Sequence, residues 1–374
     1  MFRGLAGLVS LVLLAACGGN DEDSGGAPGP TSPPQEFLVG AVDDAAREPG
    51  PVLGQLAEAG FNALNITSYW EPGLTEPTAG ELAALGDTAA RAANEELTVV
   101  VAVFHRGSRT TPLTDAARAE FASYTAAIVR RIPQIQDVVV GNEPNLNRFW
   151  LPQFGPNGEN VASGAYFALL AQVYDAVKAA NADVRIWGGA LAPRGVDKPG
   201  TGRDTQSPGR FLQGLGEAYR ASGREKPPLD GLAYHPYPES SAIAPDQANP
   251  PGGKAIGLAE HDRLRELVRS AFGSDLPILY AELGVETAVP ESKQSLYEGT
   301  EPAQTVDEQT QADYYRRALE LAACQKGVAG ILLFHSHDEP VLAGFQSGVY
   351  YVDGTPKASL EPVRSAIRAA QDGC

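Results

Sequence analysis

Two glutamates, Glu143 and Glu282, each end a run of apolar residues in this chain of 374 residues. The first run spans residues 137–143 and the second spans residues 277–282. A buried strand that stops on a carboxylate places an ionisable group where the strand meets solvent. Two such ends facing one pocket would supply the pair of carboxyl groups that glycoside hydrolysis uses. This chemistry requires a fold that brings the two strand ends together.

Short apolar runs alternate with longer amphipathic stretches along the chain from Phe37 onward. Eight runs predict strands, at residues 37–42, 61–67, 98–105, 137–143, 184–191, 229–235, 277–282 and 328–335. Five amphipathic stretches predict helices, at residues 80–96, 114–131, 163–180, 257–272 and 308–325. Most strand candidates are rich in Val, Ile, Leu and Ala without strict alternation, which is typical of parallel strands covered on both faces.

This alternation indicates the α/β class and a (β/α)8 TIM barrel that forms a single catalytic domain over residues 36–374. An open, doubly wound sheet is the alternative, but no glycine-rich phosphate loop follows the first strand. In a TIM barrel the carboxyl ends of the strands form the active face. Glu143, ending strand four, and Glu282, ending strand seven, are therefore expected in one mouth. Long segments rich in Gly and Pro after strands five to eight would wall a cleft there.

The chain resembles the clan A glycoside hydrolases, retaining (β/α)8 enzymes that include cellulases, mannanases and β-xylosidases. Four features carry the resemblance: Asn142-Glu143-Pro144 at the end of strand four, Glu282 ending strand seven, His235-Pro-Tyr237 at strand six, and the tail segment 347–357. The resemblance as a whole covers roughly residues 37–370. The resemblance implies a cellulase-like or β-xylosidase-like enzyme that cleaves β-glycosidic bonds of oligo- or polysaccharides, with no cofactor and no metal.

The resemblance also implies a role for each residue. Glu143 would be the general acid and base, with its pKa raised by burial and by the second carboxylate. Glu282 would be the nucleophile, kept ionised by a hydrogen bond from Tyr237. Asn142 would hydrogen-bond the 2-hydroxyl of the sugar, a contact that strengthens in the transition state.

Further polar and aromatic residues are expected around the sugar. The histidines His105 and His235, at the ends of strands three and six, would complete a polar wall. Trp70 and Trp150 lie near strand ends of the expected active face, where their rings could stack on sugars. Trp187 lies inside strand five and is expected in the core.

The sequence departs from the clan at two strand ends. Many members carry an Arg near the end of strand two, where this chain has Thr67-Ser-Tyr-Trp70. Many also place a Trp at the end of strand eight, where this chain has Phe334 and His335, and one of these two is expected to substitute for it. The identity of the sugar therefore stays open.

Two other functions fit the same residues. His335 and His337, if they lie on one side of an extended strand end, could ligate a metal together with Glu143, Glu282 or His235. A metal-dependent hydrolase would use that site to activate water. The second alternative is a non-catalytic glycan-binding lipoprotein built on an inherited barrel.

The N-terminal residues predict export. An apolar run at residues 5–16, too short to span a bilayer, ends at Cys17 in a sequence that resembles a bacterial lipobox. Residues 1–16 are expected to be a lipoprotein signal peptide, Cys17 the lipidated residue, and 17–35 a disordered tether. The protein would then lie outside the cytoplasm, held to the membrane by its lipid alone. An ordinary secretory peptide is the alternative.

Charge and cysteine content narrow the partners and the compartment. The formal net charge of -17 argues against nucleic acid and anionic membranes as charge-driven partners. An exported compartment permits a disulfide between Cys324 and Cys374. Closing a loop of about 51 residues would stabilise the fold by about 4 kcal/mol. Two unpaired thiols are the alternative.

Overall fold

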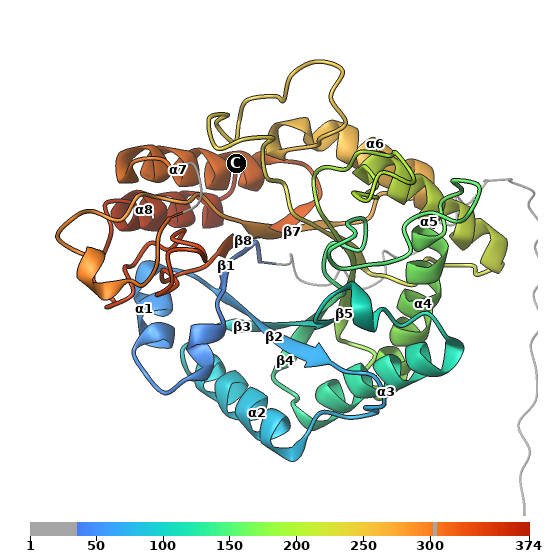
Figure 1. Cartoon of the computed structure of the whole chain (residues 1–374). Coiled ribbons are helices and arrows are strands. Elements are labelled where there is room, and N and C mark those ends of the chain that lie inside the picture. Colours follow the sequence, from blue (N-terminus) through green and yellow to red (C-terminus); the bar gives the residue numbers. More distant parts are fainter. Residues whose placement is uncertain (1–35, 302–304) are drawn as a thin grey trace, which may run out of the picture. The chain divides into compact units, whose positions relative to one another are not determined.

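The structure, a computed structural model, describes residues 36–301 and 305–374 (Figure 1). The expected signal peptide, the lipidation site Cys17 and the tether lie outside these residues. Glu36–Cys374 form one compact unit. In the part that is described, no helix is both long enough and apolar enough to cross a membrane.

Eight parallel strands close into a barrel in chain order, which confirms the predicted (β/α)8 fold (Figure 1). The strands are β1 (Leu38–Val42), β2 (Ala63–Trp70), β3 (Thr98–His105), β4 (Ile135–Val140), β5 (Arg185–Leu191), β6 (Gly231–Tyr234), β7 (Ile278–Leu283) and β8 (Val328–Phe334). Parallel pairing of β1 with β8 closes the ring. The carboxyl ends of all eight strands therefore meet at one mouth.

Helices surround this barrel (Figure 1). They are α1 (Val52–Ala59), α2 (Ala79–Asn94), α3 (Asp115–Arg131), α4 (Ala162–Ala180), α5 (Pro208–Ser222), α6 (His261–Phe272), α7 (Glu308–Cys324) and α8 (Leu360–Gln371). The five predicted stretches correspond to α2, α3, α4, α6 and α7. Helix α6 begins later than predicted because a short 3₁₀ turn, Leu258–Glu260, precedes it. Helices α1, α5 and α8 were not predicted.

The interior of the barrel holds a separate apolar cluster. Its largest member is Trp187, whose indole N–H donates to Oδ1 of Asp137 at 2.6 Å, so the expectation that this residue lies in the core is confirmed. Toward the mouth the cluster contains small side chains, among them Ala102, Ala190 and Ala281. Bulky branched residues usually fill the inside of such barrels. The small residues here leave room at the mouth.

Several contacts hold the last strand and the tail in place. Oδ2 of Asp43, after β1, accepts the backbone N–H groups of Ser336 at 3.0 Å and His337 at 3.2 Å, after β8. A disulfide joins Cys324 to Cys374, which ties the end of α7 to the chain beyond α8.

The tail also contains a buried ion pair. Nζ of Lys357 lies 2.7 Å from Oδ1 of Asp338, and both side chains are almost fully enclosed. The ammonium also donates to Oγ1 of Thr287 at 2.8 Å and to the carbonyl of Gln346 at 3.0 Å. All three donors of the buried cation are therefore used.

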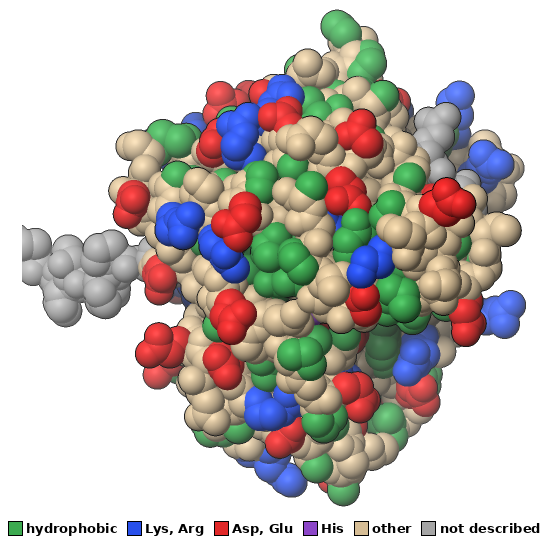
Figure 2. All heavy atoms as spheres, turned by 90° about the vertical axis from the view of Figure 1, so that its left-hand side faces the viewer, with side chains coloured by type: hydrophobic (Ala, Val, Ile, Leu, Met, Phe, Trp, Pro, Cys, Tyr) green, Lys and Arg blue, Asp and Glu red, His purple; other side chains and the backbone are tan. Residues whose placement is uncertain are grey.

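Acidic and basic side chains are interspersed on the face that carries α1, α7 and α8 (Figure 2). Helix pairs such as Arg316 with Glu320 and Arg364 with Glu361 contribute to this mixture. The negative charge of the chain is thus not gathered into a single patch on this face.

Candidate active site

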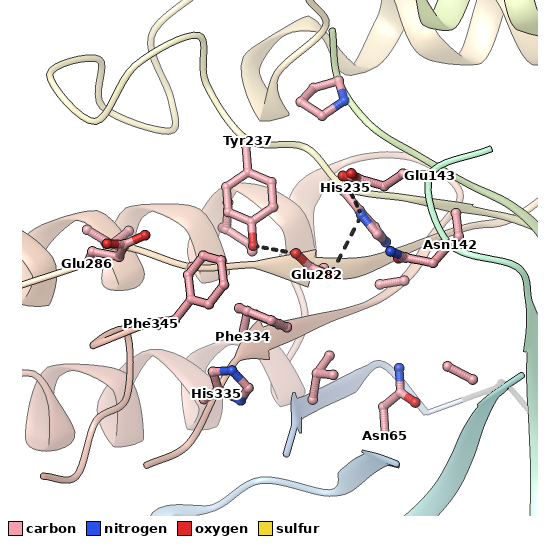
Figure 3. Close-up of a pocket in the computed structure, with 18 of the residues that line it drawn as sticks. Asn65, Asn142, Glu143, His235, Tyr237, Glu282, Glu286, Phe334, His335 and Phe345 are labelled. Carbon is pink, nitrogen blue, oxygen red and sulfur yellow. Dashed lines mark hydrogen bonds and ion pairs between the residues drawn. The ribbon is translucent and has the colours of Figure 1, made fainter. Parts of the chain in front are cut away.

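A cavity of about 670 Å³ lies at the carboxyl ends of the strands. Seven residues singled out from the sequence line it together, namely Asn142, Glu143, His235, Tyr237, Glu282, Phe334 and His335 (Figure 3). They come from segments that are far apart in the sequence and that the closed barrel brings to one mouth.

An irregular turn positions Glu143. Strand β4 ends at Val140, and Gly141 and Glu143 then adopt left-handed backbone conformations, with φ of 83° and 42°. The backbone N–H of Glu143 donates to the carbonyl of Ala190 at 2.8 Å, which fastens the turn to β5. Such a conformation costs a non-glycine residue roughly 1–3 kcal/mol and is concentrated at functional sites.

The side chain of Asn145 fastens the same loop to the segment that follows β5. Its side chain is fully buried and donates to the carbonyls of Ala192, Arg194 and Gln206, at 3.2, 3.2 and 2.9 Å. Its Oδ1 accepts the N–H of Ala192 at 2.9 Å. Asn145 directly follows Asn142-Glu143-Pro144 in the sequence. Its positioning role was not predicted, because its partners lie in a loop that no sequence pattern places.

Glu282 lies near the end of β7 and shares a histidine with Glu143. The hydroxyl of Tyr237 donates to Oε1 of Glu282 at 2.8 Å. Nδ1 of His235 lies 3.2 Å from Oε1 of Glu143 and 3.7 Å from Oε2 of Glu282. Figure 3 shows this imidazole between the two carboxylates.

Burial and neighbouring charges shift the pKa values of Glu282 and His235. Burial, reinforced by the charge of Glu143, raises the pKa of Glu282, although His235 and the Tyr237 hydroxyl act in the opposite direction. Burial alone would lower the pKa of His235, but Glu282 and Glu143 outweigh it and raise that pKa. The hydrogen bond from Tyr237 thus favours the ionised form of Glu282 as expected, yet burial has the larger effect. Glu282 and His235 therefore hold their protons to a higher pH than the isolated side chains would.

An aromatic wall stands at the end of β8. The rings of Phe334 and His335 have centroids 4.0 Å apart, and Phe345 packs edge-on against Phe334 at 4.9 Å. All three residues line the cavity. They occupy the place where the clan pattern has a Trp. Phe345 was not predicted, since it lies ten residues beyond His335 in an irregular segment.

Three residues expected at the site lie elsewhere, and this corrects the sequence-based assignment. Trp70 is fully buried against Phe121 of α3, and its indole N–H donates to the carbonyl of Leu74. Trp150 is 1% exposed and packs edge-on against the ring of His105. His105 is 4% exposed and bonded to a backbone carbonyl, and burial lowers its pKa. None of the three lines the cavity.

The expected pairing of His335 with His337 around a metal is also corrected. Strand β8 ends at Phe334, so the alternation assumed for the two histidines does not continue. His337 is buried and bonded to Gln55 at 2.8 Å and to Ser336 at 2.9 Å. Within residues 36–301 and 305–374, no group of three or more His, Cys, Asp or Glu side chains could hold a metal ion.

Solved structures with similar folds include proteins named as glycosidases. A family 39 glycoside hydrolase from Bacteroides cellulosilyticus WH2 aligns with a TM-score of 0.65 at 17% identity, covering 90% of this chain and 64% of that one. The β-glycosidase BGL167 aligns at 0.57 and 18% identity, covering 88% and 86%. The GH5_18 protein from Streptomyces cattleya, in complex with Manb1-4GlcNAc, aligns at 0.61 and 15% identity, covering 89% and 80%.

These likenesses show the fold. The chain spans about two thirds of the length of the family 39 enzyme, 64%. No family model matches the sequence, and no curated protein matches it either. The function of the site is therefore inferred from the residues that form it.

Proposed function

We propose that the protein is a retaining glycoside hydrolase that cleaves β-glycosidic bonds in oligo- or polysaccharides. The observation that carries the proposal is the placement of Glu143 and Glu282 against one nitrogen of His235. These two contacts limit the separation of the nearest carboxylate oxygens to at most about 7 Å. That limit includes the roughly 5–5.5 Å of retaining enzymes and excludes most of the roughly 6.5–9.5 Å of inverting enzymes. The fold likeness to proteins named as glycosidases supports the same reaction.

In the proposed mechanism Glu143 protonates the leaving oxygen while Glu282 attacks the anomeric carbon. A glycosyl-enzyme forms, and water deprotonated by Glu143 then releases the sugar. His235 contacts both carboxylates and so responds to the charge that moves between them. Tyr237 holds the attacking carboxylate in one orientation, and Asn142 lies beside Glu143, where it would bond the 2-hydroxyl.

A covalent trap tests the mechanism. A 2-deoxy-2-fluoro aryl β-glycoside slows release of the glycosyl-enzyme, so mass spectrometry should find the label on Glu282. Glu282→Gln should lower turnover of aryl β-glycosides by roughly a thousandfold or more. Glu286→Gln, the same change at a cavity carboxylate that does not touch His235, should cost at most about tenfold. Comparable losses in the two variants would count against the assignment.

A screen of aryl glycosides would identify the sugar that the site accepts. Residues 36–374 should be screened on aryl β-glucosides, β-xylosides and β-mannosides, the last because the Streptomyces cattleya protein was solved with Manb1-4GlcNAc. Sugar binding without turnover on all of them would favour the non-catalytic alternative.

We also propose that the full chain is an extracytoplasmic lipoprotein anchored through Cys17. The disulfide between Cys324 and Cys374 supports an oxidising compartment. Cys17→Ala should release the protein from the membrane fraction and abolish incorporation of a fatty-acid label. Continued labelling of that variant would rule out the anchor.

A further inference from the structure

Asn65 lies on the floor of the cavity, and its carboxamide has no partner. The residue is 3% exposed, its Oδ1 is fully enclosed, and no hydrogen bond or ion pair to its side chain exists in the part of the chain that the structure describes. Buried polar side chains are normally hydrogen-bonded, because an unpaired amide loses its water without compensation. An unpaired amide beside an open cavity is a group prepared for a ligand.

The direction of the side chain follows from strand register. Asn65 on β2 pairs with Val42 on β1 and Val100 on β3. Ala63, two residues earlier on the same face, belongs to the cluster inside the barrel, so Asn65 also points inward. Figure 3 shows Asn65 beneath Glu282 and Asn142, with the amide nitrogen on the side of the glutamates.

Small apolar side chains share the lining of the cavity with Asn65. Ala102, Val139, Ala190 and Ala281 line it from β3, β4, β5 and β7, and all four belong to the apolar cluster inside the barrel. Because three of the four are alanines, they leave room in this part of the cavity. The floor therefore offers one carboxamide among methyl groups.

We propose that Asn65 hydrogen-bonds a polar substituent of the reacting sugar, one that combines a hydrogen-bonding group with an apolar carbon. The inference rests on the proposed function and specifies its substrate class. A carboxamide has two donors and an acceptor oxygen, and with no partner it can rotate to present either end. The alanine methyl groups would pack against this apolar carbon, which is the methylene of a hydroxymethyl group or the methyl of an acetamido group. Two sugar substituents share this chemistry, the hydroxymethyl group of a hexose and the acetamido group of an N-acetylated amino sugar; a pentose such as xylose has neither.

The consequence is a preference for hexoses or N-acetylated amino sugars over pentoses. A site built to hydrogen-bond a group rejects the analogue that lacks it, because its own buried polar atoms are then left unpaired. Asn65 is thus a specificity-determining residue, separate from the pair of glutamates.

Three aryl glycosides that differ by one group test this. Wild type and Asn65→Ala are compared on p-nitrophenyl β-xyloside, β-glucoside and N-acetyl-β-glucosaminide. Asn65→Ala should lower kcat/KM about 10- to 100-fold on the glucoside or the N-acetylglucosaminide and no more than about threefold on the xyloside. A loss on the glucoside identifies the hydroxymethyl group, and a loss confined to the N-acetylglucosaminide identifies the acetamido group. Equal changes on all three, or no change, would overturn the proposal.

Two controls separate binding from folding. Asn142→Ala changes a second cavity asparagine and should lower the xyloside and glucoside rates alike. The melting temperature of Asn65→Ala should equal or exceed that of wild type, because the removed amide has no partner to lose. A clear fall in melting temperature would show that Asn65 is structural and would also overturn the proposal.

A binding measurement keeps the inference apart from the proposed hydrolysis. Calorimetry in the Glu282→Gln background, with and without Asn65→Ala, is run on the methyl β-glycosides of the same three sugars. Binding that weakens on loss of Asn65, without turnover by wild type, would reject hydrolysis and keep the inference. If wild type hydrolyses these sugars and Asn65→Ala does not change their relative binding, only the inference is rejected. The inference is also rejected if the Glu282→Gln protein binds none of the three sugars.

Discussion

The hydroxyl of Tyr237 donates a 2.8 Å hydrogen bond to the carboxylate of Glu282. This bond opposes the effect of burial, which raises the pKa of Glu282. Because Glu282 must be ionised to attack, activity should fall with acidification at a higher pH than for an ordinary glutamate. Tyr237→Phe removes a contribution that lowers this pKa, so the acidic limb of kcat/KM should move further toward neutral pH. At neutral pH we expect about a tenfold loss, and an unchanged pH profile would contradict the role.

The same buried carboxylate should make the wild type less stable than one of its inactive variants. The pKa of Glu282 is higher in the folded protein than in the unfolded chain, so its ionisation costs stability as pH rises through this interval. Glu282→Gln should therefore raise the melting temperature at neutral pH by a few degrees. At about pH 4, where the side chain is largely protonated, the gain should disappear. A variant that melts lower than wild type at both pH values would refute this account.

Loss of Glu143 should depend on the leaving group. A good leaving group such as dinitrophenolate needs no proton, whereas an alcohol does. Glu143→Ala should thus cost roughly 10²–10⁴-fold on an unactivated disaccharide and far less in the first step on a dinitrophenyl glycoside. Pre-steady-state bursts measure that step. Equal losses on both substrates would exclude Glu143 as the acid.

The aromatic wall should matter for longer substrates. The side chain of Phe345 is 39% exposed at the cavity, so Phe345→Ala removes a stacking surface without opening the core. KM for oligosaccharides should rise roughly three- to tenfold, in line with about 0.5–1.5 kcal/mol for a ring contact. Leu296→Ala, similarly exposed but outside the cavity, is the control and should leave KM as it is.

The buried pair of Lys357 and Asp338 should dominate the stability of the tail. Lys357→Met would leave an uncompensated carboxylate and should lower the free energy of unfolding by about 3–5 kcal/mol. Lys293→Met breaks a comparable but partly exposed pair with Asp353 and should cost about 0–1 kcal/mol. Urea denaturation of the two variants gives the comparison, and similar losses would contradict it.

The strands, the shared mouth and seven of the residues that line it could be predicted because apolar runs and strand-end carboxylates are local features. The side of a strand on which a terminal residue lies was predicted less well. Asn65, Thr67 and Tyr69 form an alternating polar row on β2 that lines the cavity, so Trp70 must face outward. Had that polar row been taken as the inward face of the strand, Trp70 would not have been predicted to contact the sugar.

The same parity places His105 outside the cavity, because Ala102 and Phe104 of β3 line it. Trp150 and Phe345 follow no such rule. They lie in irregular segments whose course depends on contacts such as those of Asn145, and no periodicity in the sequence encodes these.

The pairing of β1 with β8 determines the stage of folding at which the cavity can form. Asp43 and Ser336, which meet at the ends of these two strands, are 293 residues apart in the sequence. A chain synthesised from its N-terminus cannot form this contact until β8 has been made, and closing so long a loop is a slow step in folding. Asn65, on β2, is therefore made early but faces a complete pocket only when nearly the whole chain is present. The cavity is a product of the last stage of barrel closure.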